Sequence, residues 1–266
     1  MNKKKDFISV IITNFNKERY LSNSLNSVLD QNYKNFEIIL FDDCSTDSSI
    51  DIIKKFKKIK LIKNNKKRFT SGPLNQIYGI LKAFSISKGK VICLLDSDDK
   101  FEKKKLNEIN NFFKKNLSID FITNLPKGNS NFSLKRREAN NSNWPSIFPT
   151  SCISFRRSFF LKFKEKITPK KFPNLEIDAR LIIYAYYYSL NKKVTIINKK
   201  LTEYVKSYNS ISSYYPKFSI NWWLKRKEAF DYLKFILKGK KEIFIISLDY
   251  FVTNIIYFLL TLFKKK

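Results

Sequence analysis

The sequence predicts an α/β fold in which a Rossmann-like, mainly parallel sheet is flanked by helices. Short apolar runs alternate with amphipathic stretches through the first 125 residues, and this alternation is typical of βαβ units. The chain has 266 residues, which is enough for one sizeable core and an appendage. We expect an α/β domain over residues 1–215, with halves at about 1–125 and 126–215, and a helical tail over residues 216–266.

The apolar runs have the length of buried strands. The strand candidates are Ile8 to Thr13, Phe36 to Phe41, Lys60 to Lys63, Val91 to Leu95, Ile119 to Thr123, Thr150 to Phe155 and Val194 to Ile197. Two apolar stripes with helical spacing lie between them and are assigned to the core: Leu21, Leu25, Val28 and Leu29, then Ile77, Ile80, Leu81 and Phe84. We also expect an aromatic-rich helix from Leu175 to Leu190 and a long polar loop from Pro126 to Pro149.

The composition narrows the chemistry. The chain has no histidine, which excludes Ser-His and Cys-His catalysis and leaves carboxylates as acid–base groups and metal ligands. Three widely spaced cysteines indicate neither a disulfide framework nor a thiolate metal site. The net charge is +29, but aromatic and basic residues do not interleave as nucleic-acid binding requires. We therefore expect no nucleic-acid partner.

Three acids follow an apolar strand in the run LLDSDD, namely Asp96, Asp98 and Asp99. Their mutual repulsion requires water or a cation for compensation. Carboxylate oxygens favour hard cations such as Mg²⁺ or Mn²⁺. The pattern indicates either a metal site that holds a diphosphate or a solvated acidic turn that caps a helix.

Asp42 and Asp43 end another strand, in FDDCSTDSS, and the following helix is expected to begin within Ser45, Thr46 and Asp47. Ligands of open α/β sheets bind at the carboxyl ends of the strands. One carboxylate could cap the helix while the other accepts a hydrogen bond from a nucleobase or a ribose. Capping alone is the alternative.

Glu176 and Asp178 lie in PNLEIDARL, at the expected start of the aromatic helix. Helix N-termini favour acids for electrostatic reasons alone. These residues taken by themselves do not separate a catalytic role from a structural one.

Residues 242–263 read EIFIISLDYFVTNIIYFLLTLF and are followed by three lysines. The stretch is long enough to span a bilayer. One of its faces is nevertheless polar and carries Asp249, Tyr250, Thr253, Asn254, Tyr257 and Thr261. We expect a helix that lies in the membrane interface, with basic ends attracted to anionic lipid. A single span and a helix packed on another protein are the alternatives, and Trp222 and Trp223 could add an interfacial anchor.

Taken together, the segments SVIITNFNKERYLSNSLNSVLDQNYKNFEIILFDDCSTDSS, LKAFSISKGKVICLLDSDD and NLEIDARL resemble glycosyltransferase family 2, which has the GT-A fold. The resemblance covers roughly residues 7–212. It implies that Thr13, Phe15 and Asn16 line a nucleotide site. It also implies that Asp43, with Asp42 beside it, contacts the base.

The same resemblance assigns the remaining acids. Asp98 is expected to bind a divalent cation, and Asp96 to contact the ribose or a metal-bound water. Asp178 matches the family's general base, with Ile177 where a Glu commonly stands and Glu176 one place earlier. The role of Asp99 stays open.

Three further positions depart from the family's pattern. Leu74 replaces an Arg, and Val205 and Ser207 replace an Arg and a His in YVKSYNSIS. Lys206 is a candidate substitute for the missing phosphate charge. A catalytically silent membrane-surface binding protein therefore stays open as an alternative. A nucleotidyltransferase is the other rival, although TNFNKERY has no glycine-rich loop.

The resemblance implies an inverting, metal-dependent glycosyltransferase that uses Mg²⁺ or Mn²⁺. The expected donor is a nucleotide-sugar, preferably a UDP-sugar, and the expected acceptor is a glycan or a lipid-linked sugar of the cell envelope. With the tail, it predicts a location on the cytoplasmic face of the cytoplasmic membrane.

Overall fold

The structure is a computed structural model of the whole chain and describes residues 5–127, 145–167, 170–188, 194–205, 207, 210–237 and 248–263. Within these residues, one eight-stranded sheet has the order β3-β2-β1-β4-β7-β6-β8-β5. The strands are β1 (Ile8–Asn14), β2 (Phe36–Asp42), β3 (Ile59–Lys63), β4 (Val91–Asp96), β5 (Lys100–Phe101), β6 (Phe121–Lys127), β7 (Ile153–Arg156) and β8 (Thr195–Glu203).

The half of the sheet formed by β3, β2, β1 and β4 is parallel, as the alternating sequence pattern predicted. Strand β7 is antiparallel to both β4 and β6, β5 is antiparallel to β8, and β6 and β8 are parallel. Parallel neighbours place their carboxyl ends at one edge of the sheet. Asn14, Asp42 and Asp96, which end β1, β2 and β4, therefore lie along this edge.

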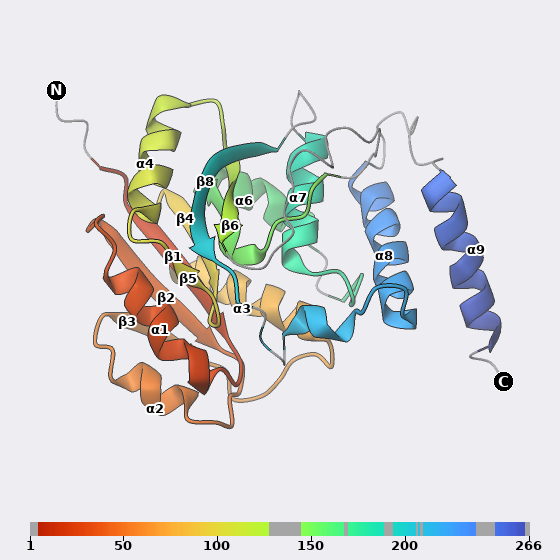
Figure 1. Cartoon of the computed structure of the whole chain (residues 1–266), viewed down its shortest axis with the longest axis horizontal. Helices are drawn as coiled ribbons and strands as arrows, with labels where there is room; N and C mark the ends of the chain where they lie inside the picture. The colour runs from red at the N-terminus through yellow and green to blue at the C-terminus, as the bar shows by residue number, and fades with distance from the viewer. Residues whose placement is uncertain are drawn as a thin grey trace.

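Helices cover both faces of the sheet (Figure 1). They are α1 (Glu18–Leu29), α2 (Ser49–Lys54), α3 (Gly72–Ile86), α4 (Lys105–Lys115), α6 (Arg157–Lys164), α7 (Ile177–Tyr188), α8 (Ile220–Leu237) and α9 (Leu248–Phe263), with 3₁₀ turns η1 (Thr150–Cys152) and η2 (Ile211–Tyr214).

Each face of the sheet has its own apolar core, because successive strand residues point to opposite sides. Ile11 in β1 packs with α3, α6 and α7, whereas its neighbours Val10 and Ile12 pack with α1 and α4. The stripes predicted on α1 and α3 lie in these two cores. Leu29 and Leu81, at their edges, are partly buried.

Several boundaries differ from the predicted ones. Residues 150–152 form η1 rather than strand, and only Ile153–Arg156 pair as β7. Strand β8 continues to Glu203, six residues beyond its predicted end at Ile197. Helix α2 begins at Ser49, because the Asp47 carboxylate accepts hydrogen bonds from the backbone N–H groups of both Ser49 and Glu18 before the first turn. Of the predicted loop, residues 128–144 lie outside the described residues.

The C-terminal helices stack outward from the sheet, with α8 between α7 and α9 (Figure 1). Helix α9 covers residues 248–263 of the predicted tail helix, and residues 242–247 lie outside the described part. None of the described helices combines the length and apolarity needed to cross a bilayer.

Candidate active site

A cavity of about 1150 Å³ opens at the carboxyl ends of β1, β2 and β4. Its walls come from the loops after these strands, the start of α3, η1, the start of α7 and the η2 region. This volume is at the upper end of those typical of small-molecule sites. It accommodates a ligand of several rings.

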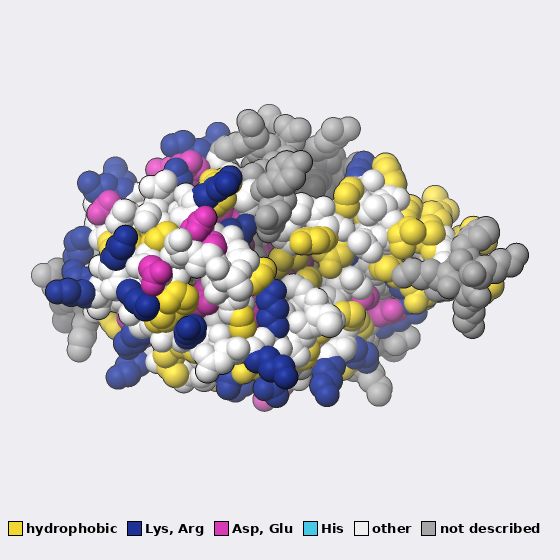
Figure 2. All heavy atoms as spheres, turned by 90° about the horizontal axis from the view of Figure 1, so that it is seen from below, with side chains coloured by type: hydrophobic (Ala, Val, Ile, Leu, Met, Phe, Trp, Pro, Cys, Tyr) yellow, Lys and Arg dark blue, Asp and Glu magenta, His cyan; other side chains and the backbone are white. Residues whose placement is uncertain are grey.

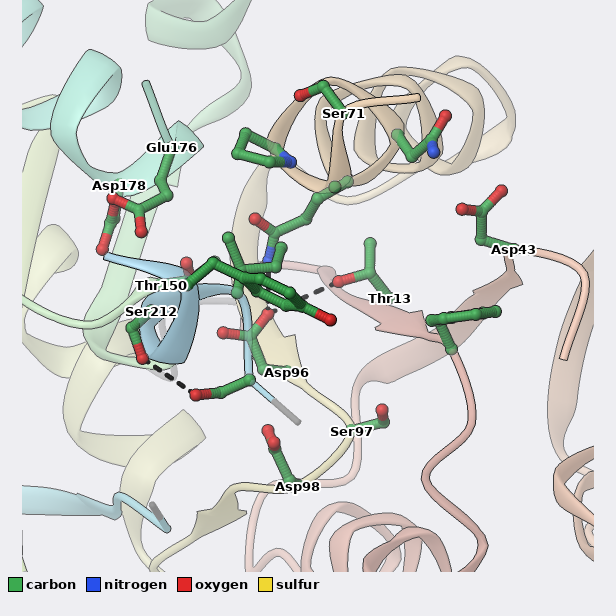
Figure 3. Close-up of a pocket in the computed structure, with 18 of the residues that line it drawn as sticks. Thr13, Asp43, Ser71, Asp96, Ser97, Asp98, Thr150, Glu176, Asp178 and Ser212 are labelled. Carbon is green, nitrogen blue, oxygen red and sulfur yellow. Dashed lines mark hydrogen bonds between the residues drawn. The ribbon is translucent and has the colours of Figure 1, made fainter. Parts of the chain in front are cut away.

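The acids predicted to act together line this one cavity. In Figure 3, Asp43 lies at one side, Glu176 and Asp178 lie at the other, and Asp96 lies between them with Asp98 close by. The structure thus brings together carboxylates from the carboxyl ends of β2 and β4 and from the start of α7. Their convergence is what the sequence analysis required of a joint site.

Asp96 forms the centre of the cavity floor. Its carboxylate accepts hydrogen bonds from Gln76 Nε2 at 2.8 Å and Thr13 Oγ1 at 3.4 Å. Burial, followed by repulsion from Asp99 and Asp98, raises the pKa of Asp96 well above its ordinary value. The cavity floor therefore holds excess negative charge that a cation would relieve.

Asp98 has its own positive partner. Lys17 Nζ lies 2.8 Å from its Oδ2 atom, and both side chains are nearly buried. Ser207 Oγ donates to the same oxygen at 2.5 Å and accepts from Lys17 Nζ at 2.6 Å. Ser207 stands where the family's pattern has a His, so the substituted position still reaches the acid.

Asp99 lies behind this pair and is 1% exposed. Its Oδ1 accepts from the Val205 backbone N–H at 2.8 Å, and its Oδ2 is buried without a hydrogen-bond partner in the described part of the chain. Burial first, and then Asp98, raise its pKa to about 7. Lys105, buried nearby, donates to Ser151 O and Thr202 Oγ1, and burial lowers its pKa to about 8.

The donor set of Asp96 and Asp98 fits a hard divalent cation. Among the described residues no group of three or more Asp, Glu, His or Cys side chains forms a metal cluster. Mg²⁺ sites, however, commonly use one or two carboxylates and complete their shell with substrate phosphates and water. The unpartnered Oδ2 of Asp99 and the raised pKa of Asp96 agree with a site whose negative charge is only partly compensated by Lys17.

The adjacent acids Asp42 and Asp43 have different surroundings. Asp43 lines the cavity and accepts a hydrogen bond from Asn64 Nδ2 at 2.9 Å. Asp42 is fully buried, and its carboxylate accepts from Asn14 Nδ2 and from both the Oγ and the N–H of Ser45. Asp42 is therefore absent from the cavity lining and holds the loops after β1 and β2 together.

The other predicted nucleotide-site residues, Thr13, Phe15 and Asn16, all line the cavity. Phe15 is 40% exposed, and the Lys67 ammonium lies 3.5 Å from its ring centre. An exposed ring in the wall of a cavity is suited to stacking with a planar base. Asn16 joins the loop after β1 to the loop before α2 by accepting from the Thr46 N–H at 2.8 Å.

At the opposite wall, Glu176 and Asp178 lie side by side at the start of α7 (Figure 3). Ile177 between them is fully buried, because adjacent residues of a helix turn point in different directions. Burial, and then repulsion from Glu176, raise the pKa of Asp178 well above its ordinary value, while Lys225 opposes the rise. Glu176, one place before the position of the family's Glu, therefore lies beside Asp178.

Several site residues carried no signal that the sequence analysis used. Lys17, Gln76 and Ser151 contact the acids, and Ser151 Oγ accepts from the Asp96 backbone N–H at 2.9 Å. Leu74 packs in the core at the position of the family's Arg. Lys206 lies outside the described residues.

The sequence matches a known protein family. Residues 9–174 match the profile of glycosyl transferase family 2. The UDP-Glc:alpha-D-GlcNAc-diphosphoundecaprenol beta-1,3-glucosyltransferase WfaP of Escherichia coli is 42% identical over 96 residues, which are 35% of this chain and 36% of that protein. The chain spans between 18% and 43% of the length of the curated relatives that it matches.

Solved structures share the fold. The poly(ribitol-phosphate) beta-N-acetylglucosaminyltransferase TarS of Staphylococcus aureus, crystallised as residues 1–349 with UDP, superposes with a TM-score of 0.62 at 18% identity, over 94% of this chain and 69% of that one. The mannosyltransferase PcManGT of Pyrobaculum calidifontis, in complex with GDP-Man and Mn²⁺, gives a TM-score of 0.62 at 11% identity over 90% and 66%. With this α/β GT-A-like fold and the match over residues 9–174, the chain belongs to glycosyl transferase family 2, among relatives of teichoic-acid and cell-envelope polysaccharide enzymes.

Proposed function

We propose that this chain is an inverting hexosyltransferase that transfers a sugar from a UDP-sugar to a hydroxyl of a glycan or lipid-linked acceptor. The observation that carries the proposal is the convergence of Asp43, Asp96, Asp98 and Asp178 in one cavity. TarS has been crystallised with UDP and with UDP-GlcNAc. The name of WfaP specifies a diphosphoundecaprenol-linked acceptor.

The layout of the cavity suggests how the substrates lie. Asp43 and the Phe15 ring form the base end, and Asp96 lies at the centre near where the ribose and diphosphate would pass. Asp178 and Glu176 face the far end, where the acceptor hydroxyl would approach the sugar. Asp178 is the proposed general base that takes the hydroxyl proton, and its raised pKa favours proton uptake.

Asp98 and Asp96 are the proposed ligands of Mg²⁺ or Mn²⁺. When bound, the cation would supply Lewis-acid neutralisation of the departing diphosphate. Lys17 adds a fixed positive charge at the same carboxylate. The Thr13 hydroxyl, near the end of β1, orients Asp96 by donating a hydrogen bond to its carboxylate.

A UDP-release assay tests this function. The full chain is incubated with a panel of UDP-sugars, with or without Mn²⁺ or Mg²⁺, and with a polyprenyl-diphosphate sugar as acceptor. We expect acceptor-dependent UDP release for one donor that disappears on chelation. A chain that binds no nucleotide in the presence of either metal would instead be a catalytically silent member of the family.

We also propose that α9 docks the enzyme on an anionic membrane surface at the cytoplasmic face of the membrane. Seven apolar side chains on one face of α9 are 38–81% exposed: Leu248, Phe251, Val252, Ile255, Phe258, Leu259 and Leu262. Figure 2 shows hydrophobic side chains gathered at the end of the molecule that carries α8 and α9. Lysines at 238, 240, 241 and 264–266 flank this helix in the sequence, which is the charge pattern suited to anionic lipid.

The polar face of α9 lies against α8. Arg226 contacts Asp249 and donates to Thr253 Oγ1, and Lys234 contacts the Tyr250 hydroxyl. Asp249, Tyr250 and Thr253 of the polar face therefore contact α8 within the protein. The outward face of α9 is left apolar.

Vesicle flotation tests the docking surface. The full chain should float with phosphatidylglycerol-containing vesicles and much less with pure phosphatidylcholine. Replacing both Phe251 and Phe258 by Glu should lower membrane binding at least about tenfold, because two aromatic side chains that insert into lipid contribute several kcal/mol in total to binding. Leu117→Glu, at an isolated side chain that is 80% exposed, is the control. Equal flotation of the double variant, or a stable dimer that the double variant abolishes, would overturn the membrane proposal.

A further inference from the structure

We propose that Lys225, on α8, is a positioning residue of the active site that fixes Glu176 and sets the electrostatic environment of Asp178. Lys225 Nζ lies 3.2 Å from Oε1 and 3.0 Å from Oε2 of Glu176, and the two side chains are 24% and 15% exposed. The proposal rests on the function proposed above. It adds to that function a residue outside the region matched by the family, residues 9–174.

One face of α8 packs against the segment that carries Glu176 and Asp178. Three residues after Lys225, Glu228 accepts from both the backbone N–H and the side-chain amide of Asn174, at 2.7 and 2.5 Å. Tyr232, fully buried, donates to Arg180 O at 3.4 Å. Residues 225, 228 and 232 have the i, i+3, i+7 spacing of one helical face.

The turn before α7 is held in place by a network of hydrogen bonds from Arg180. Arg180 is fully buried, and its guanidinium donates to the carbonyls of Lys171, Phe172 and Leu175. Burial lowers its pKa to about 10. Because this network and α8 hold the turn before α7 from two sides, Lys225 meets Glu176 in a fixed geometry.

The Lys225 ammonium is itself held in place. It lies 4.5 Å from the centre of the Tyr215 ring, and the Tyr215 hydroxyl donates to Asn174 Oδ1 at 3.4 Å. On the adjacent face of α8, Arg226 and Phe230 pack against α9. The helix is thus fixed between the active-site turn and α9.

Among the described residues, three ionisable groups act on Asp178. Glu176 and, more weakly, Asp96 raise the pKa of Asp178, and Lys225 lowers it. Tyr215 next to Glu176 has its own pKa raised to about 12 by burial and by Glu176 and Glu228, so it is neutral at working pH. In the part of the chain that the structure describes, Lys225 is therefore the cation that opposes the rise in the pKa of Asp178 and favours the deprotonated carboxylate, the form that a general base requires.

The sign of the expected effect follows. A base loses activity as the pH falls through its pKa. Removing Lys225 raises the pKa of Asp178 and shifts the acid limb of kcat/KM to higher pH. Removing the negative charge of Glu176 does the opposite.

The experiment measures the pH profile of kcat/KM in the full chain. Lys225→Met should shift the acid limb of the kcat/KM profile to a pH about 0.5 to 1 higher, as expected for the loss of a partly solvated charge. Glu176→Gln should move it down, and Lys225→Arg should restore the original limb. The control Lys227→Met, on the same helix, removes a lysine that pairs with Asp231 and should leave the limb in place.

The outcomes separate the two proposals. If the unmodified chain transfers no sugar, the proposed function fails, and the Lys225 proposal is then tested without activity. The carboxyl ¹³C signal of Asp178, assigned by its loss in Asp178→Asn, should titrate at higher pH in Lys225→Met. An unchanged acid limb, or an unchanged ¹³C titration, in a Lys225→Met protein that keeps its unfolding temperature would overturn the proposal.

Discussion

Asp178→Asn should lower the rate of sugar transfer by about 10² to 10⁴-fold, the usual contribution of a general base. The amide keeps the shape of the side chain but cannot accept the proton of the acceptor hydroxyl. UDP affinity should stay within about twofold of the unmodified chain, because Asp178 lies at the opposite side of the cavity from Asp43 (Figure 3). Single-turnover transfer and calorimetric UDP binding measure the two quantities separately.

The control for this change is Asp231→Asn, since Asp231 pairs with Lys227 on α8 and does not line the cavity. It should transfer sugar at the ordinary rate. If Asp178→Asn also did so, another group would have to serve as the base. Loss of UDP binding together with transfer would instead assign Asp178 a structural role.

Asp98→Asn should weaken both nucleotide binding and transfer. The carboxylate is the proposed cation ligand, and losing a metal-assisted stabilisation of about 3 kcal/mol corresponds to a fall of about 100-fold in kcat/KM. The substitution also leaves the Lys17 ammonium without its carboxylate partner at 2.8 Å. Calorimetric titration of UDP with and without Mn²⁺ should show that the metal no longer strengthens binding.

Direct Mn²⁺ binding, followed by electron paramagnetic resonance without nucleotide, gives a readout independent of activity. Asp51→Asn is the control, because Asp51 is an exposed acid paired with Lys54. Equal enhancement of UDP binding by Mn²⁺ in Asp98→Asn and in the unmodified chain would show that Asp98 does not hold the cation. The dependence on metal would then have to come from elsewhere in the cavity.

The alternation of apolar runs and helical stripes was enough to predict β1 to β4 and the helices that follow β1 and β3. The placement of the acids followed from the same pattern. Because parallel strands end at one edge of a sheet, runs ending at Asp42, Asp43 and Asp96 had to converge there. The family's match and the shared fold agree with this part of the prediction.

Local sequence could not decide which of two neighbouring acids faces the cavity. Asp42 and Asp43 are identical in chemistry and adjacent, and only the packing of Asn14 and Ser45 against Asp42 commits that carboxylate to the interior. The same limit applied to the tail. The polar face of the tail did not identify what it contacts, and only the position of α8 shows that Asp249 and Thr253 bind Arg226 within the protein.

By itself, therefore, the sequence determined the parallel half of the sheet, the apolar stripes of α1 and α3 and the strand ends that carry the acids, because these depend on short-range periodicity. The tertiary structure alone decided that Lys17 and Ser207 meet Asp98 and that Lys225 meets Glu176. Lys225 and Glu176 are 49 positions apart in the sequence, and Lys17 and Ser207 are 190 positions apart. No local pattern encodes such contacts, since a long polar side chain finds its partner only after the elements that carry both have packed.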